Sequence, residues 1–362
     1  MLQGYHAKRQ YRPDFVARTG ILSAGLAPPT VDVRDHSPHV PYPYRMESEF
    51  IAWLRARLPP HPQLRLGPGD DAGILQLGSR AECVVTVDLL TDGVDFDLSA
   101  IDARRAGRKA LAVSLSDLAA MAAKPVAAVV ALALPRRGGR QLAIELYEGL
   151  IPLAERYATA IAGGDTNSWD GPLAISVTAI GEVTARGSLL RSGAQPGDRI
   201  IVTGEFGGSI SGRHLDFDPR VEEALVLNER YTLRAGIDCS DGLSLDLARL
   251  AAESRCGAVL DLSRIPISDA ATKVARRSAA VVASRNDALQ SALDHALGDG
   301  EDFELILAVP PNDAARMISE QPLAPQRLTD IGQFIAEPGL WEATTGGERQ
   351  PLPARGYEHE FD

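Results

Sequence analysis

The stretch from Leu66 to Asp97 constrains the fold of this chain more than any other part of its sequence. It opens with a Gly-Pro-Gly turn and two adjacent carboxylates, Asp70 and Asp71. An apolar run rich in β-branched residues, Cys83 to Val87, then predicts a strand that ends at Asp88. Carboxylates at a strand end, beside glycines that let the backbone approach a ligand, are the hard oxygen ligands that Mg²⁺ prefers. Each of them can equally be a turn residue that forms only local hydrogen bonds.

Acidic residues in similar surroundings recur along the chain. Asp117 lies within a run of strong helix formers, Ala103 to Ala123, that is apolar on nearly all sides from Ala110 onward and is therefore predicted to be a buried helix. A buried carboxylate is costly without a partner, so Asp117 needs a cation or several hydrogen-bond donors. The candidate set is Asp70, Asp71, Asp88, Asp117, Asp165, Asp238 and Asp241. This many carboxylates suggest several Mg²⁺ ions that clamp a polyphosphate.

The usual nucleotide and hydrolase motifs are missing from the sequence. There is no GxxxxGK[ST] loop, no strand–GxGxxG–helix unit, no GxSxG elbow and no HExxH. A nucleotide site in this chain would therefore depend on carboxylates and metal ions.

Composition excludes several other classes of protein. The net charge of −11 argues against sequence-independent binding to nucleic acid. No run approaches eighteen apolar residues and no secretory signal is recognisable, so no membrane span or export is predicted. The three cysteines have neither disulfide-like nor zinc-like spacing, which favours a reducing, cytoplasmic setting.

The length of 362 residues predicts more than one domain. Residues 1–45 hold six prolines and no periodic pattern, and we expect them to be a poorly ordered extension. Residues 46–186 are expected to form an N-terminal domain that begins with an amphipathic helix at Met46, and residues 187–362 a C-terminal one. A second helix is predicted over 141–160, and Ser240 or Asp241 is expected to cap the helix that follows. Strands and helices alternate, yet strands are also grouped, which predicts an α/β or α+β fold with mixed sheets.

Seven motifs in order carry a resemblance to a known family. They are GDDAG at 69–73, TVDLLTDGVDF at 86–96, SDLAAM at 116–121, GGDT at 163–166, RSGAQPGD at 191–198, IDCSDGL at 237–243 and GEDFELIL at 300–307. Over about residues 46–359 the chain resembles thiamine-monophosphate kinase, in the ATP-binding superfamily that includes aminoimidazole ribonucleotide synthetase.

The resemblance implies a two-domain homodimer in which N-terminal sheets pair, with ATP as co-substrate bound at the domain interface under several Mg²⁺ ions. Implied metal ligands are Asp71, Thr86, Asp88, Asp117, Asp165, Asp238 and Asp241. Implied ATP contacts are Tyr147, Gly164, Asp165, Arg191 and Ser240, and implied acceptor contacts are Asp95, Glu301 and Tyr357. The implied reaction is direct transfer of the ATP γ-phosphoryl group to thiamine monophosphate, in which the protein mainly positions groups and forms no covalent intermediate.

The acceptor motifs depart from the family pattern. Asp95 stands where the family has a histidine, and Asp299 and Phe303 stand where it has glycine and tyrosine. A carboxylate would repel an incoming phosphate unless a cation intervenes. Two other functions therefore stay open: a related ATP-dependent enzyme that acts on another small acceptor, and a non-catalytic nucleotide-binding dimer. The hydrogenase-maturation member of the superfamily ends in a reactive cysteine, whereas this chain ends in His359 to Asp362. This difference argues against a hydrogenase-maturation function.

Overall fold

A computed structural model describes residues 55–56, 61–67, 69–77, 82–279, 285–344 and 346–359. All of these belong to one compact unit, Tyr42–Asp362. The predicted N-terminal extension and most of the helix predicted at Met46 lie outside the described residues.

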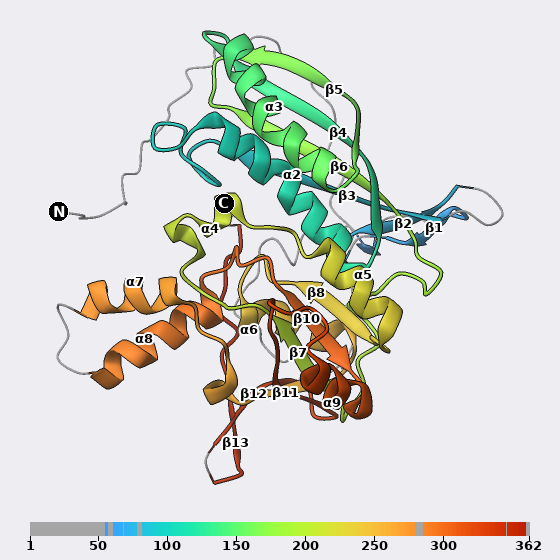
Figure 1. Cartoon of the computed structure of the whole chain (residues 1–362), viewed down its shortest axis with the longest axis vertical. Helices are drawn as coiled ribbons and strands as arrows, with labels where there is room; N and C mark the ends of the chain where they lie inside the picture. The colour runs from blue at the N-terminus through green and yellow to red at the C-terminus, as the bar shows by residue number, and fades with distance from the viewer. Residues whose placement is uncertain are drawn as a thin grey trace, which may run out of the picture. The chain divides into compact units, whose positions relative to one another are not determined.

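The N-terminal half forms a six-stranded mixed sheet in the order β1-β2-β3-β6-β4-β5 (Figure 1). Its strands are β1 (Leu64–Leu66), β2 (Gly73–Gln76), β3 (Glu82–Thr91), β4 (Lys124–Pro135), β5 (Ala160–Trp169) and β6 (Ala174–Glu182). Neighbouring strands are antiparallel except β4 and β5, which are parallel. Helices α2 (Ala103–Ala120) and α3 (Gly139–Arg156) cover one face of this sheet (Figure 1).

Two glycines let these helices approach closely. A Cβ atom at Gly107 would lie 2.0 Å from the carbonyl oxygen of Leu146, and one at Gly149 would lie 1.8 Å from that of Arg104. Any side chain at either position would push the backbones apart. The close packing fixes the place of α2, which also contacts α4, α5 and β8 of the C-terminal half.

The C-terminal half forms a seven-stranded mixed sheet in the order β13-β12-β9-β11-β7-β10-β8. Its strands are β7 (Arg199–Thr203), β8 (Ala235–Asp238), β9 (Gly257–Leu260), β10 (Leu305–Val309), β11 (Leu328–Ile335), β12 (Gly339–Ala343) and β13 (Arg349–Pro351). Only β12 and β9 pair in parallel. The helices are η1 (Ser209–Ser211), α4 (Arg213–Asp216), α5 (Val221–Arg230), α6 (Leu243–Glu253), η2 (Leu262–Arg264), α7 (Asp269–Ala279), α8 (Arg285–Gly298) and α9 (Pro311–Glu320).

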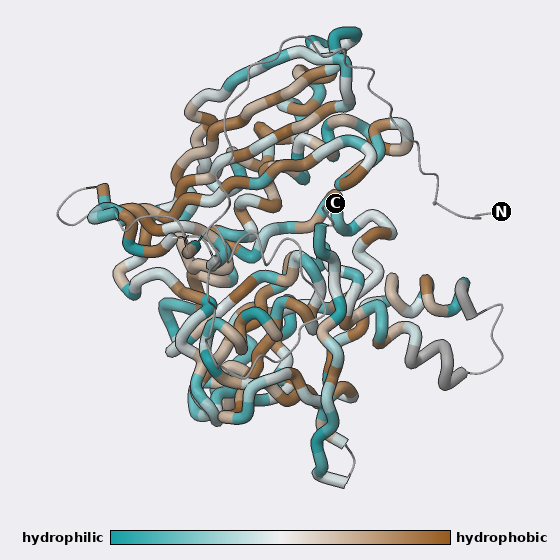
Figure 2. Tube along the Cα trace, turned by 180° about the vertical axis from the view of Figure 1, so that it is seen from behind, coloured by the Kyte–Doolittle hydropathy of each residue, from teal (hydrophilic) through white to brown (hydrophobic). Residues whose placement is uncertain are grey.

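The main hydrophobic core spans both halves, since α2 and the N-terminal sheet share it with α5, β10 and α9. Apolar residues concentrate on the strands of the two sheets (Figure 2). Two mixed sheets with helices confirm the predicted fold class. None of the described helices combines the length and the apolar character needed to cross a membrane.

The helix predicted over 141–160 is confirmed as α3, but it ends at Arg156, because the chain turns at Ala158 (φ 49°) into β5, which holds the whole GGDT motif. The predicted cap of α6 was wrong. Neither Ser240 nor Asp241 caps α6: the N-cap residue is Gly242, with no side-chain cap. Instead the Asp246 carboxylate in the first turn accepts hydrogen bonds from the backbone N–H groups of Asp241 (2.9 Å) and Gly242 (3.0 Å).

Candidate active site

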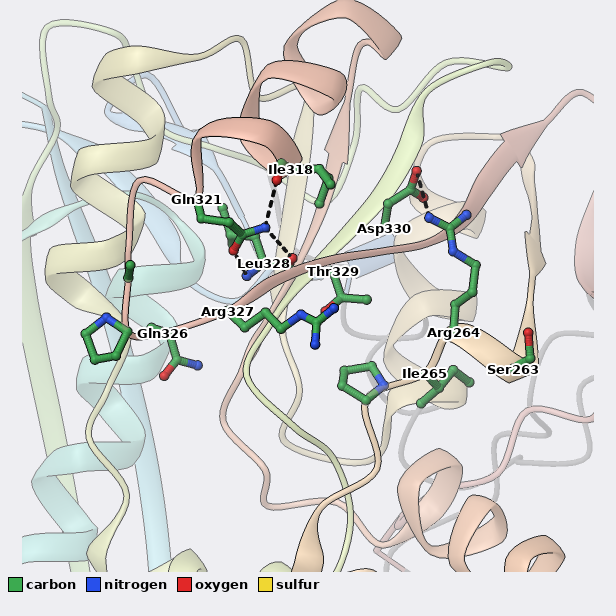
Figure 3. A pocket seen from close by; sticks show the side chains of 13 residues that line it. Ser263, Arg264, Ile265, Ile318, Gln321, Gln326, Arg327, Leu328, Thr329 and Asp330 are labelled. Atoms are coloured by element: carbon green, nitrogen blue, oxygen red, sulfur yellow. Dashed lines mark hydrogen bonds and ion pairs between the residues drawn. The ribbon is translucent and has the colours of Figure 1, made fainter.

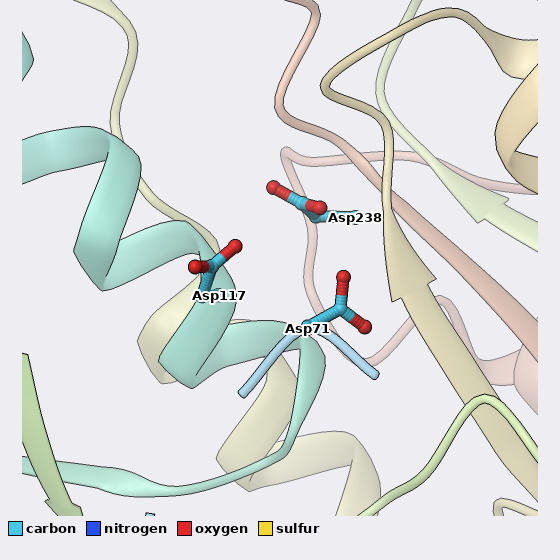
Figure 4. Close-up of side chains that lie close together, drawn as sticks. All are labelled: Asp71, Asp117 and Asp238. Carbon is cyan, nitrogen blue, oxygen red and sulfur yellow. The ribbon is translucent and has the colours of Figure 1, made fainter. Parts of the chain in front are cut away.

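Three of the predicted carboxylates meet where the two halves of the chain join. One oxygen atom each from Asp71, Asp117 and Asp238 lies within 4.8 Å of the other two (Figure 4). Asp71 precedes β2, Asp117 is on α2 and Asp238 ends β8, so only the tertiary fold brings them together. The structure thus brings together three of the carboxylates that the sequence singled out, and their role as metal ligands stays a prediction.

Hydroxyl groups hold two of these carboxylates in place. Thr86 Oγ1 on β3 donates to Asp117 Oδ2, and Ser116 Oγ donates to Asp238 Oδ2 at 2.5 Å. Burial and then neighbouring carboxylates, Asp88 first for Asp117 and Asp71 first for Asp238, raise the pKa of both groups well above the ordinary value. A group of hard oxygen donors whose negative charges repel one another fits a divalent cation such as Mg²⁺.

Arg191 is the main positive charge at this group. Its Nη2 and Nε atoms donate to the two carboxylate oxygens of Asp71 at 2.6 and 3.1 Å. Its backbone N–H donates to Asp70 at 3.1 Å, and burial followed by the charge of Asp71 raises the pKa of Asp70 to about 6. Arg191 therefore links the segment between the halves to the Gly69–Asp71 turn.

Asp88 follows Thr86 by two residues on β3 and lines a cavity. It accepts a hydrogen bond of 2.6 Å from Ser114 Oγ on α2. Burial raises the pKa of Asp88 to about 6, with a smaller contribution from Asp95. Because Thr86 and Asp88 are two residues apart on β3, both side chains face α2.

The cavity beside Asp88 has a volume of about 440 Å³ and collects most of the remaining predicted residues. Those lining it are Asp88, Asp95, Ser240, Asp241, Glu301 and Tyr357. They come from the end of β3, the turn before α6, the turn before β10 and the C-terminal segment. The predicted acceptor contacts thus share one cavity with two predicted metal ligands, Asp88 and Asp241, and one predicted ATP contact, Ser240.

Lys109 is the functional candidate that sequence reasoning missed. It is 1% exposed on α2, and its Nζ donates to the backbone oxygen of Asp95 (2.8 Å) and to Glu301 Oε1. It thereby joins the turn after β3 to the turn before β10. The signal in the sequence was a lysine directly before the apolar part of this helix, since a lysine that is buried there needs an anion.

The Asp95 and Asp241 carboxylates both accept hydrogen bonds from other groups of the chain. Asp95 Oδ2 accepts from the backbone N–H of Thr91 at 2.6 Å and so closes its own turn. Asp241 Oδ2 accepts from Arg249 Nη1, and Arg249 also contacts Asp246 Oδ1 at 3.0 Å. Asp241 lines the cavity but is not among the three converging carboxylates. Arg249 and Asp246 were not predicted.

Asp165 does not join the other carboxylates. The register across the sheet shows which residues of β3 and β5 share a face. Asp88 on β3 is aligned across β6 and β4 with Gly164 on β5, and Leu89 is aligned in the same way with Asp165. Adjacent residues of a strand face opposite sides of a sheet, so Asp165 projects from the face that α2 and α3 leave open. A Cβ atom at Gly164 would lie 1.9 Å from the carbonyl oxygen of Val130, which explains this glycine by strand packing. Tyr147 lies on α3 and packs against the main core.

A larger cavity, of about 790 Å³, lies in the C-terminal half between η2, the end of α9 and β11 (Figure 3). None of the predicted site residues lines it. Its carboxylate, Asp330, is already paired with Arg199 (2.8 Å) and more weakly with Arg264 (3.5 Å). We therefore place the active site in the smaller cavity beside the converging carboxylates.

Comparison with known proteins identifies the family of the chain. The family described as AIR synthase related protein matches the chain twice, its N-terminal domain at residues 69–183 and its C-terminal domain at residues 195–340. A thiamine-monophosphate kinase from Rhodopirellula baltica is 41% identical over 321 residues, which cover 87% of this chain and 97% of that protein. The chain belongs to the thiamine-monophosphate kinase family.

Solved structures of the family share the fold. The crystal structure of a thiamine-monophosphate kinase from Stenotrophomonas maltophilia is 33% identical, with a TM-score of 0.61 over 81% of this chain and 95% of that one. AaThiL, solved in complex with AMPPCP and TMP, is 22% identical, with a TM-score of 0.68 over 86% and 95% of the two chains. The family and the two-domain fold predicted from the motifs are thus confirmed.

Proposed function

We propose that this chain is an ATP- and Mg²⁺-dependent kinase that transfers the γ-phosphoryl group of ATP to thiamine monophosphate and so forms thiamine diphosphate. Membership of the thiamine-monophosphate kinase family supports the reaction. The observation that carries the proposal is the 440 Å³ cavity, which places the acceptor candidates Asp95, Glu301 and Tyr357 beside Asp88.

In the proposed site, Asp71, Thr86, Asp88, Asp117 and Asp238 would hold Mg²⁺, and bound Mg²⁺ would neutralise the phosphate charge that develops during transfer. Ser114 and Ser116 hold Asp88 and Asp238 in place by hydrogen bonds of 2.6 and 2.5 Å. The proposed reaction needs no protein nucleophile, since the acceptor phosphate attacks directly.

The remaining site assignments stay proposals. Arg191 and Ser240 lie at the junction of the two halves and are proposed to contact ATP. Arg191 is now held by Asp71, so bound nucleotide would share its guanidinium with that carboxylate. The proposed ATP contacts Tyr147, Gly164 and Asp165 are on α3 and β5, at the far edge of the N-terminal sheet.

A homodimer that pairs the open faces of two N-terminal sheets would account for the separation of Asp165 from the other proposed metal and ATP contacts. Val87, Leu89 and Val126 are 64%, 65% and 45% exposed on the strands of this sheet, which is unusual for large apolar side chains. Asp165 projects from the same face. Pairing of two such faces would bury the apolar surface and bring Asp165 of one subunit towards its partner.

The proposed reaction places the protein where ATP is available and thiols stay reduced. Cys83, Cys239 and Cys256 are buried and unpaired. Burial raises the pKa of the Cys239 thiol, as expected for a small core residue and not for a reactive nucleophile. We propose a cytoplasmic location on this basis.

The test is Mg²⁺-dependent formation of ADP by the purified full-length chain, with and without thiamine monophosphate, with thiamine diphosphate detected directly. Product formation only when all three components are present supports the kinase. ATP turnover without thiamine diphosphate would favour another acceptor, a reading that Asp95 keeps open. ATP binding without any turnover would favour a non-catalytic nucleotide-binding dimer.

A further inference from the structure

The 790 Å³ cavity between η2, the end of α9 and β11 is separate from the proposed kinase site, because the two cavities share no lining residue. Its volume lies in the range of small-molecule binding sites. The charged residues in its lining are Arg264, Arg327 and Asp330 (Figure 3). Two cations against one anion stand out in a chain whose net charge is −11, and they point to a ligand of negative charge.

We propose that this cavity is a second ligand site, which binds a small phosphate monoester. The phosphate would lie at Arg264 and Arg327, and the organic group of the ester would lie against the apolar part of the wall. This site goes beyond the proposed kinase function and does not depend on it.

Asp330 does not cancel the positive charge of the cavity, because another arginine already neutralises its carboxylate. Arg199 Nε and Nη2 donate to the two carboxylate oxygens of Asp330 at 2.9 and 2.8 Å. A pair of parallel charged hydrogen bonds is the strongest form of this contact. Arg264 Nη2 lies 3.5 Å from Asp330 Oδ2, which is too far for a good hydrogen bond. Its donors are therefore available to a ligand.

Arg327 brings a guanidinium group that no carboxylate holds. Among the described residues this group forms no ion pair and no hydrogen bond, whereas the Arg327 carbonyl oxygen is fixed by the N–H of Gly204 at 3.0 Å. Figure 3 shows the guanidinium group beside Thr329, whose Oγ1 is buried without a hydrogen-bond partner in the described part of the chain. A buried hydroxyl in this state is costly, and a phosphate oxygen bound by Arg327 would give it an acceptor.

Hydrogen bonds fix the walls around these donors. Gln321, at the end of α9, donates through Nε2 to the Leu328 carbonyl oxygen at 3.0 Å and accepts through Oε1 from the Leu328 N–H at 2.9 Å. On the η2 side, the Pro266 carbonyl oxygen accepts from the N–H of Phe206 at 2.8 Å. Because the walls are fixed in the absence of a ligand, little conformational entropy is lost when one binds.

The apolar part of the lining indicates an ester and not a bare phosphate ion. It consists of Ile265, Pro266, Ile318, Ala324 and Pro325. A phosphate ion would fill a small part of the cavity and leave these side chains in contact with water. An organic group on the phosphate would cover them, and apolar surface removed from water adds to affinity. Two arginines from different segments also suit the oxygens of a tetrahedral dianion better than a planar carboxylate.

Isothermal titration calorimetry of the full-length chain with phenyl phosphate, in the presence of EDTA, tests the site. EDTA removes metal ions, so the carboxylates of the other cavity repel a phosphate. The wild type should bind one phenyl phosphate per chain. Inorganic phosphate, which lacks the ring, and benzoate, which has the ring but a planar monoanion, should each bind at least tenfold more weakly.

Arg264→Gln and Arg327→Gln should each weaken the binding of phenyl phosphate about tenfold, because each removes a charged donor. Both side chains are exposed, so the variants should fold, and melting temperatures check this. Arg137→Gln is the matched control, since it removes an exposed arginine of the turn before α3, outside both cavities.

No binding of phenyl phosphate by the wild type would overturn the proposal, as would equal binding by the two cavity variants and Arg137→Gln. Benzoate bound as tightly as phenyl phosphate would overturn the assignment to a phosphate ester. The experiment contains neither Mg²⁺ nor ATP, so its result is independent of the kinase assay.

Discussion

At the scale of single residues, the site combines buried negative charges that Arg191 neutralises only in part and that a bound cation would neutralise further. Asp117 is the clearest case: its pKa is raised by burial, and Thr86 gives it a hydrogen bond without charge. Groups placed for ligand binding in this way usually cost stability when the ligand is absent. Function and stability should therefore respond to this residue in opposite directions.

Asp117→Asn should abolish the stabilisation that Mg·ATP gives and lower kinase activity at least a hundredfold, because a charged metal ligand is lost. The metal-free variant should melt a few degrees higher than the wild type, about 1 kcal/mol in unfolding free energy, since repulsion within the carboxylate group is relieved. Differential scanning calorimetry with and without Mg·ATP measures both effects. An unchanged shift with Mg·ATP would remove Asp117 from the metal site.

Asp95→Asn and Asp95→Ala distinguish the charge of Asp95 from its structural hydrogen bond to Thr91. The asparagine oxygen can still accept that bond, so Asp95→Asn should raise the KM for thiamine monophosphate by a few fold through loss of charge alone. Asp95→Ala should raise it further and lower kcat, because the turn that carries Val94 loosens. Equal kinetics in the two variants would show that the hydrogen bond does not matter.

At the scale of elements, the glycine-rich turn between β7 and η1 depends on one buried carboxylate. Asp302 accepts two hydrogen bonds from Gly207, yet burial raises the pKa of Asp302 to about 7. A raised pKa means that the folded chain binds a proton that the unfolded chain has released. The free energy of unfolding must therefore fall as pH rises from about 4 towards about 7.

Asp302→Asn should flatten this part of the pH–stability profile, since asparagine does not titrate. Relative to the wild type, the variant should gain stability as pH rises across that window. Urea unfolding at pH 5, 6 and 8 measures the difference, and Asp216→Asn, an exposed carboxylate on α4, serves as control. A difference between variant and wild type that is constant with pH would contradict the assignment.

The close packing of α2 against α3 depends on glycine at their contact. Gly149→Ala should destabilise the fold by about 1–3 kcal/mol, because the new Cβ would lie 1.8 Å from the Arg104 carbonyl oxygen. Gly139→Ala, in the same helix, meets only a Leu134 side-chain carbon at 3.1 Å and should be close to neutral. Chemical denaturation gives both values. Equal stability of the two variants would mean that the helices can separate without cost.

At the scale of the whole molecule, the open face of the N-terminal sheet is the surface that we propose to pair with a second copy of the chain. It carries exposed Val87 and Leu89 on β3 and Val129 on β4, and Asp165 on β5 projects from it. The three converging carboxylates lie on the other, helix-covered side. In the proposed homodimer, a second copy of the chain would complete the set of predicted ATP and metal contacts.

Val87→Asp should convert the proposed dimer into monomers and lower kinase activity at least tenfold, because a charge at the centre of an apolar interface is costly. Ile151→Asp on α3 is the control, since Ile151 is 43% exposed on the helix side of the sheet. Sedimentation equilibrium of both variants measures the change. A wild type that is monomeric at micromolar concentration would contradict the dimer directly.

The sequence by itself determined the elements, the family and the residue types of the site. Strand and helix periods placed β3, α2 and β10, and Asp117 inside an apolar helix already indicated a buried carboxylate. These properties are local, because they depend on side-chain spacing within one segment. Only the tertiary structure decided which carboxylates meet, that Lys109 pairs with Glu301, and that Asp165 faces the opposite side of the sheet. Those facts depend on strand order and on contacts between residues from different segments, up to 192 positions apart for Lys109 and Glu301, which spacing along the chain does not encode.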